Sequence, residues 1–325
     1  MFGELPKIFG KEFLIGHFLP AAVFFVAAAI AADLSGSFPV FDLLKKTFVE
    51  VEEKKLAFNL GFTLLLVWAV ATLLLVLNFK LIRVLEGYGA VNPARLLKRR
   101  SLRLFDQLNA RVDRISEKPR ISNAELSERR RLRTRLANEF PEQRNLVLPT
   151  RFGNVVRAFE RYPQIIYNIE AIRSWIRLQA VLPEAYKNSL DAAKTVLDFF
   201  VHIWFGSVVI AVAALLRLAY VMSSHIDGGF AWTLLVISGC GAFSALLAAK
   251  SAQEAAGQWG ELVKAAFDLY RGDLCKQLGF ELPHEIERER RMWAPICRTM
   301  IYRQARYAAE FTEFRPAADR KPDDS

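Results

Sequence analysis

Three ionisable side chains lie near the ends of long apolar segments, where such groups are unusual. His17 falls one helical turn into the first apolar segment, and Asp198 and His202 bracket the start of the third. Asp198 and His202 are four residues apart and therefore share one face of a helix. Ionisable groups inside a membrane are costly and often mark proton paths, ion paths or metal sites. The alternative is structural: two interfacial histidines and a carboxylate that is paired locally.

Arg217 is another ionisable residue within an apolar segment. It lies 15 residues beyond His202, which places it about 22 Å farther along a helix. We expect its side chain to extend to the far membrane surface, or to pair with Asp33 or Asp227. A structural role, by pairing or by reaching the surface, is the favoured interpretation, and a gating or anion-binding role is the alternative.

Small residues recur about every four positions on the fourth apolar segment, at Gly241, Ala245 and Ala249. This spacing lets helix backbones approach closely, because membrane helices associate through packing. The pattern predicts a contact face. Its partner is either a helix of the same chain or a second copy in a homo-oligomer.

A basic surface is predicted between the second and third apolar segments. It comprises Lys98, Arg99, Arg100, Arg129, Arg130, Arg131, Arg133 and Arg135. Beside a bilayer, such a surface attracts anionic lipid head groups. An acidic cytoplasmic protein is a second candidate partner. Nucleic acid would also satisfy the charge, but the sequence carries no nucleic-acid-binding fold signature.

Motifs for catalysis and for cofactors are absent from the sequence. It contains no Walker phosphate loop, no dinucleotide fingerprint, no HExxH and no GxSxG. Cys275, His284 and Cys297 do not have the spacing of zinc ligands. The odd number of cysteines indicates no disulfide framework. We therefore predict a protein that is not an enzyme and that holds no metal or cofactor.

Four apolar segments must position these residues: 13–32, 58–79, 199–221 and 230–249. Each has about 20 residues and would span about 30 Å as a helix, the thickness of the hydrocarbon core. The stretch Leu64–Leu77 lacks the polar stripe of a soluble helix. The first segment exceeds the 7–15 residues typical of a signal-peptide core, so we expect an uncleaved anchor. The predicted fold class is an all-α integral membrane protein with four transmembrane helices.

The charge distribution predicts the orientation of these spans. Residues 80–195 carry 24 Lys and Arg against 12 Asp and Glu, and basic loops face the cytoplasm. The predicted order is a cytoplasmic N-terminus (1–12), span one (13–32), an external loop (33–57), span two (58–79), a basic helical cytoplasmic region (80–198), span three (199–221), an external hairpin (222–229), span four (230–249), a helical cytoplasmic C-terminal region (250–314) and a disordered tail (315–325).

The cytoplasmic regions are predicted to be helical. Ser122 and Glu125 form a capping-box pattern. The remaining boundaries rest on prolines and glycines. The expected helices are 122–139, 151–161 ended by Pro163, 169–181, inward extensions of spans three and four, and a last helix from 285 to 314.

Leu148–Pro163 and Gly260–Arg271 resemble segments of an uncharacterised group of bacterial four-span membrane proteins. The resemblance implies an inner-membrane protein and carries no known activity. We predict a non-enzymatic membrane protein whose basic cytoplasmic domain binds a partner or signal and couples it to the spans. The alternative is an oligomeric ion channel or transporter with an inner-leaflet polar site at His17, Asp198 and His202.

Overall fold

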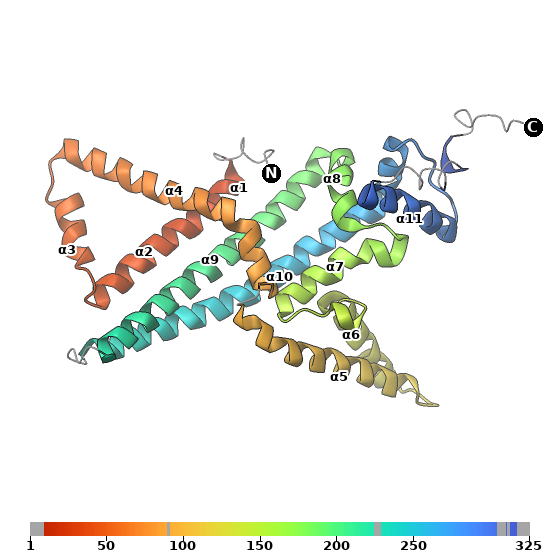
Figure 1. The fold of residues 1–325 in the computed structure, drawn as a ribbon, viewed down its shortest axis with the longest axis horizontal. Coiled ribbons are helices and arrows are strands. Elements are labelled where there is room, and N and C mark those ends of the chain that lie inside the picture. The colour runs from red at the N-terminus through yellow and green to blue at the C-terminus, as the bar shows by residue number, and fades with distance from the viewer. Residues whose placement is uncertain (1–9, 90–91, 224–228, 304–309, 311–312, 317–325) are drawn as a thin grey trace, which may run out of the picture. The chain divides into compact units, whose positions relative to one another are not determined.

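The structure is a computed structural model that describes residues 10–89, 92–223, 229–303, 310 and 313–316. Within these residues every regular element is a helix (Figure 1). Four helical segments are long and apolar enough to cross a membrane: Lys11–Leu34, Lys55–Glu86, Glu184–Ser223 and Ala231–Gln277. The predicted all-helical class with four candidate spans is therefore confirmed.

The chain divides into two compact units. The first contains Met1–Ala90 and Ala192–Ala255, and the second contains Val91–Asp191 and Ala256–Ser325. Both units include parts of the two longest helices, α9 (Glu184–Ser223) and α10 (Gly229–Gln277). These two helices run without interruption from the predicted spans into the flanking regions, as expected from the absence of helix breakers.

The first unit begins with a helical segment that contains a π-helical turn. Its elements in chain order are α1 (Lys11–Phe13), η2 (Leu14–Phe18), α2 (Leu19–Leu34), α3 (Val40–Leu44), η3 (Lys45–Val49) and α4 (Glu53–Glu86). The segment 33–57, expected to be a loop, therefore contains helical elements. α2 and α4 lie close together near α1 and diverge towards α3 (Figure 1).

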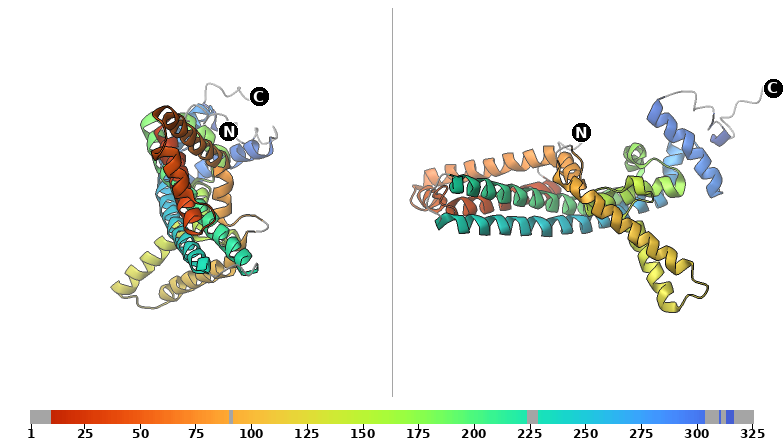
Figure 2. Two further views of the ribbon diagram at one scale, coloured as in Figure 1. Left: turned by 90° about the vertical axis from the view of Figure 1, so that its left-hand side faces the viewer. Right: turned by 60° about the horizontal axis from the view of Figure 1, so that its bottom comes forward.

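In the first unit α9 and α10 lie side by side (Figure 2). Ala214 and Val221 of α9 form one apolar cluster with Leu234 of α10. Ser207 Oγ and Ser244 Oγ are 2.9 Å apart and share a hydrogen bond between the same helices. Residues 224–228, which include most of the predicted hairpin, lie outside the described residues.

The second unit adds shorter helices. They are η4 (Pro93–Leu97), α5 (Lys98–Ser116), α6 (Asn123–Glu139), η5 (Arg144–Leu146), α7 (Arg151–Tyr167), α8 (Ala171–Val181) and α11 (Ile286–Tyr302). The predicted capping box is confirmed, because Ser122 Oγ accepts from Glu125 N and the Glu125 carboxylate accepts from Ser122 N. Phe105 and Leu108 of α5 form one apolar cluster with Leu132 and Leu136 of α6 and with Phe140, which caps α6.

Two predicted helix ends in this unit are wrong. α7 continues through Pro163 and ends at Asn168, which adopts a left-handed conformation with φ 63°. α11 likewise contains Pro295 but ends at Tyr302, well before the predicted residue 314. Phe314 instead accepts a hydrogen bond from Glu281 N through its carbonyl. Residues 1–9, 304–309 and 317–325 lie outside the described residues.

Candidate functional site

The π-helical turn η2 and the middle of α9 form the candidate site. η2 carries Gly16 and His17, and α9 carries Asp198 and His202 one turn apart. A Cβ on Gly16 would lie 3.5 Å from Thr195 Cγ2 and 3.8 Å from Asp198 Cβ. These are ordinary van der Waals distances, so η2 and α9 are in direct contact at Gly16. π-Helical turns are frequent at functional sites, because they disturb the regular backbone hydrogen bonding.

The two predicted histidines are in contact. The ring centroids of His17 and His202 are 4.8 Å apart, with 50° between the planes. His17 is 6% exposed and His202 is 2% exposed. His202 Nδ1 lies 2.7 Å from the carbonyl oxygen of Gly16. A carbonyl can only accept, so Nδ1 carries a proton and donates.

Asp198, one turn before His202 on α9, pairs with a cation that was not predicted from the sequence. Lys194 Nζ donates to Asp198 Oδ2 at 2.7 Å, one helical turn away on α9. Asp198 is 5% exposed, and burial of a carboxylate is costly unless it is paired and hydrogen-bonded. Lys194, Asp198 and His202 recur every four residues, which is the sequence signal that identifies Lys194.

Several polar atoms of this region form no hydrogen bond within the described residues. They are His17 Nδ1, Asp198 Oδ1, His202 Nε2 and, on α4, Asn78 Oδ1. The carbonyl of Leu74, one turn before Asn78, lies near the His202 ring without forming a hydrogen bond to Nε2. Adjacent imidazoles beside a carboxylate can take up and exchange protons. Among the described residues, no group of three His, Cys, Asp or Glu side chains could hold a metal ion.

Arg217 and Asp33 do not form the expected ion pair within the described residues. Asp33 Oδ1 instead accepts from the backbone N–H of Phe41, which fixes the turn after α2. The Arg217 guanidinium lies 5.4 Å from the ring centroid of Tyr220 on its own helix. Asp227, the other expected partner, lies outside the described residues.

The small residues of α10 face α9 of the same chain. A Cβ on Gly241 would lie 3.0 Å from Ala211 Cβ and 3.1 Å from Ser207 O. Ala245 is buried, while Ala249 is partly exposed and its neighbour Ala248 is buried instead. The helix that packs against Gly241 is therefore α9 of the same chain.

The predicted basic surface lies on α5 and α6 of the second unit. Lys98, Arg99, Arg100, Arg130, Arg131 and Arg133 are exposed, while Arg129 and Arg135 are half-buried. Arg135 pairs with Glu139 at 3.0 Å. Arg144 makes a two-pronged contact with Asp106, and this hydrogen bonding lowers the pKa of the Asp106 carboxyl.

A polar network in the second unit was not predicted from the sequence. The hydroxyls of Tyr162 and Tyr167, both on α7, donate to Asp268 of α10 at 3.0 and 2.7 Å. Burial, followed by the hydrogen bond to Asp268, raises the pKa of Tyr162 to about 12. Arg271, on α10 like Asp268, donates to the buried Glu289 of α11 at 2.8 Å. The spacing of Tyr162 and Tyr167 did not predict this network, because Asp268, which accepts both hydrogen bonds, is more than 100 residues away in the sequence.

The chain matches no protein-family model, no curated protein and no solved structure. The assignment of a function therefore rests on the geometry of the chain itself.

Proposed function

We propose that this chain is an integral protein of the bacterial inner membrane with four spans and both termini in the cytoplasm. It acts without catalysis: its basic helical region, residues 80–198 with 250–314, binds a partner or signal and couples it to the spans. The four long apolar helices support the membrane part of the proposal. The excess of basic residues in 80–195 supports the cytoplasmic location of that region.

The observation that carries the proposal is the length of α9 and α10. They have 40 and 49 residues, or about 60 and 74 Å at 1.5 Å per residue, against about 30 Å of hydrocarbon core. α9 holds Asp198 and His202 in the first unit, and Tyr186, whose hydroxyl donates to Leu262 O, in the second. One continuous helix thus contributes residues to both units, and a packed helix can carry energetic coupling between sites.

Anionic lipid head groups are the partner that the basic surface supports first. Arg130, Arg131 and Arg133 are exposed on one helix, and each basic residue near an anionic membrane contributes about 1 kcal/mol of attraction. An acidic cytoplasmic protein fits the same charge and is the second candidate. Nucleic acid is not proposed.

The topology is tested by thiol labelling of intact cells with a membrane-impermeant maleimide. Ser37 is exposed in the turn after α2, whereas Ser35 is buried, so Ser37→Cys is the better external probe. In a Cys240→Ser background, Ser37→Cys should label from outside and Ser122→Cys only after permeabilisation. Labelling of Ser122→Cys in intact cells would refute the topology.

Coupling is tested by amide hydrogen exchange of the full chain in nanodiscs. Addition of phosphatidylglycerol to phosphatidylcholine should slow exchange in 98–139 and also in 184–200 of α9. The triple variant Arg129→Gln, Arg130→Gln, Arg131→Gln should lose both effects. A lipid response confined to 98–139 in the wild type would leave binding without coupling and refute this function.

A proton or ion path is the second candidate function, favoured by the buried polar atoms of His17, Asp198 and His202. Four helices enclose little space, so such a path would require a homo-oligomer. Proteoliposomes loaded with a pH-sensitive dye would test it. His202→Gln should abolish proton flux and His284→Gln, in the second unit, should not. Equal flux in both variants, or none in the wild type, would exclude the path.

A further inference from the structure

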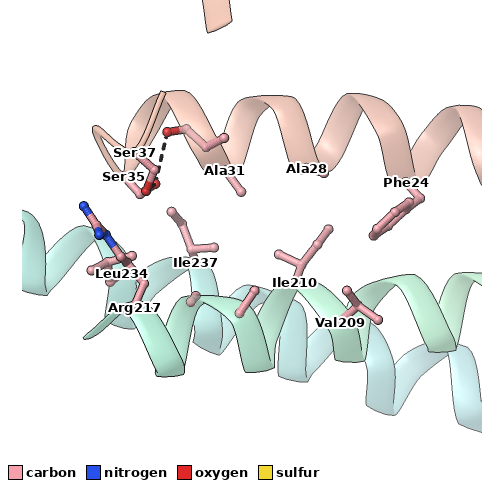
Figure 3. A pocket seen from close by; sticks show the side chains of 13 residues that line it. Phe24, Ala28, Ala31, Ser35, Ser37, Val209, Ile210, Arg217, Leu234 and Ile237 are labelled. Carbon is pink, nitrogen blue, oxygen red and sulfur yellow. Dashed lines mark hydrogen bonds between the residues drawn. The ribbon is translucent and has the colours of Figure 1, made fainter. Parts of the chain in front are cut away.

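An apolar groove runs between α2 and α9, at the opposite end of these helices from the histidines. It has a volume of about 230 Å³, and Leu234 and Ile237 of α10 also line it (Figure 3). The side chains that line it are small or aliphatic over most of its length, and both α2 and α9 contribute alanines. The lining includes Ala28, Ala31, Ala213, Ala214, Ile210 and Ile237.

The two ends of the groove differ in polarity. Phe24 lies at one end, packed so closely on Gly206 that a Cβ there would be 2.9 Å from Phe24 Cδ2. Arg217 lies at the other end beside Ser35 and Ser37, whose hydroxyl oxygens are 2.8 Å apart (Figure 3). The guanidinium forms no ion pair within the described residues. Ser35 Oγ donates to Ala32 O and accepts from Ser37 Oγ, so the guanidinium supplies the donors at this end of the apolar groove.

The length of the groove matches one leaflet. From Ser35 to Phe24 is 11 residues and from Arg217 to Val209 is 8, so the groove runs about 12–16 Å along the helices. Half of the hydrocarbon core is about 15 Å. A groove that begins at the end of a span and reaches its middle fits one acyl chain, with its head group at the polar end.

We propose that this groove binds one anionic phospholipid, with an acyl chain between α2 and α9 and with the phosphate on the Arg217 guanidinium. Arginine is suited to this role because its planar guanidinium donates two parallel hydrogen bonds to phosphate. The small side chains along α2 and α9 supply the space for the chain. The proposal rests on the membrane integration proposed above, and is independent of the partner-binding and coupling role.

Native mass spectrometry of the delipidated full chain in detergent tests the site. Phosphatidylglycerol and phosphatidylcholine with identical acyl chains serve as probes. The wild type should bind one phosphatidylglycerol in preference to phosphatidylcholine. Arg217→Gln should weaken phosphatidylglycerol binding about fivefold, down to the level of phosphatidylcholine, and Arg217→Lys, which keeps the charge but not the two parallel donors, should retain only part of the preference.

A larger side chain in the groove tests the contribution of the acyl chain to binding separately from that of the head group. Ala213→Leu should weaken binding of both lipids, whereas Ala219→Leu, on α9 but outside the lining, should leave both unchanged. Unchanged lipid preference in Arg217→Gln would overturn the proposal, as would equal binding by the two leucine variants. Displacement of the lipid by glycerol phosphate would indicate a site for free anions and overturn it as well. Loss of hydrogen-exchange coupling with lipid binding intact would instead refute the proposed function alone.

Discussion

Gly260 allows α7 and α10 to pack, and its replacement by alanine provides a quantitative test of the second unit. A Cβ at this position would lie 2.4 Å from Phe159 Cδ1 and 2.8 Å from Phe159 Cγ. Carbon atoms in contact are normally about 3.5–4.0 Å apart. The ring cannot easily move away, because it packs edge-on against Trp259 with centroids 5.3 Å apart. Either the ring or one of the helices must shift.

The magnitude follows from a comparison with Gly257, which lies one turn earlier on α10 and where a Cβ would have nothing within 4 Å. Both substitutions gain about 1 kcal/mol of helix propensity, so that contribution cancels between the variants. The difference is the cost of overpacking, about 1–3 kcal/mol. Gly257→Ala should therefore stabilise the chain, and Gly260→Ala should be less stable than Gly257→Ala by that difference.

The assay is thermal unfolding of the full chain in detergent, followed by tryptophan fluorescence. For a unit of this size, 1–3 kcal/mol corresponds to about 2–12 °C in Tm. Phe159→Ala should reduce the effect of Gly260→Ala, since the side chain that the new methyl meets is gone. Equal Tm values for the two glycine variants would refute the close contact. Strict additivity of Gly260→Ala with Phe159→Ala would refute its assignment to the Phe159 ring.

Three further predictions concern other parts of the chain. In the first unit, Gly241→Ala should lower the Tm relative to Gly239→Ala, because only Gly241 meets α9 backbone within 3.1 Å; equal values would show that α9 and α10 are farther apart. In a Cys240→Ser background, N-ethylmaleimide at pH 7.5 should label neither remaining thiol of the folded chain and both in denaturant, because burial raises the pKa of Cys275 to about 12 and also raises that of Cys297. In α6, hydrogen bonds from Lys118 and from Ser122 lower the pKa of Glu125 from 4.5 to about 2. The stability that the charged Glu125 adds to the folded state is therefore complete above pH 4.5 and is lost as the pH falls towards 2. Glu125→Ala should accordingly speed amide exchange in residues 122–128 at pH 6, and the difference from the wild type should disappear near pH 2; a difference that persists there would exclude the charged capping box as its source.

Depth along a helix could be predicted from the sequence, whereas rotation about its axis could not. His17 and His202 each lie one turn inside an apolar segment, and this equal depth correctly suggested that they could meet. Asn78 lies near the end of the second apolar segment, yet an apolar helix without a polar stripe gives no indication of which side chain faces inward. The same limitation hid the groove, because alanines are as compatible with lipid as with a neighbouring helix.

Local rules also failed where distant contacts outweighed them. A proline inside a helix costs about 3 kcal/mol, since it removes one backbone hydrogen bond and crowds the preceding turn. α7 nevertheless continues through Pro163, and tyrosines on both sides of the proline, Tyr162 and Tyr167, donate to Asp268. Those two hydrogen bonds require the helical course to continue past the proline. Ser122 was predicted correctly because its capping partner is only three residues away.

The order of contacts along the helices is consistent with the proposed topology. In a chain of four alternating spans, the first and third run in the same direction and the second and fourth run in the opposite direction. His17 near the start of the first span meets His202 near the start of the third, and Ser35 at the end of the first lies in the same groove as Arg217 near the end of the third. Leu74, close to this histidine pair, belongs to the later part of the second span. At the histidine end, Lys80 and Arg83 follow the second span and Lys194 precedes the third. From residue 195 to residue 223, the last described residue of α9, Arg217 is the one lysine or arginine. The positive-inside rule then favours a cytoplasmic location for the histidine end, and places Arg217 at the opposite end of the third span, where a lipid phosphate can reach it.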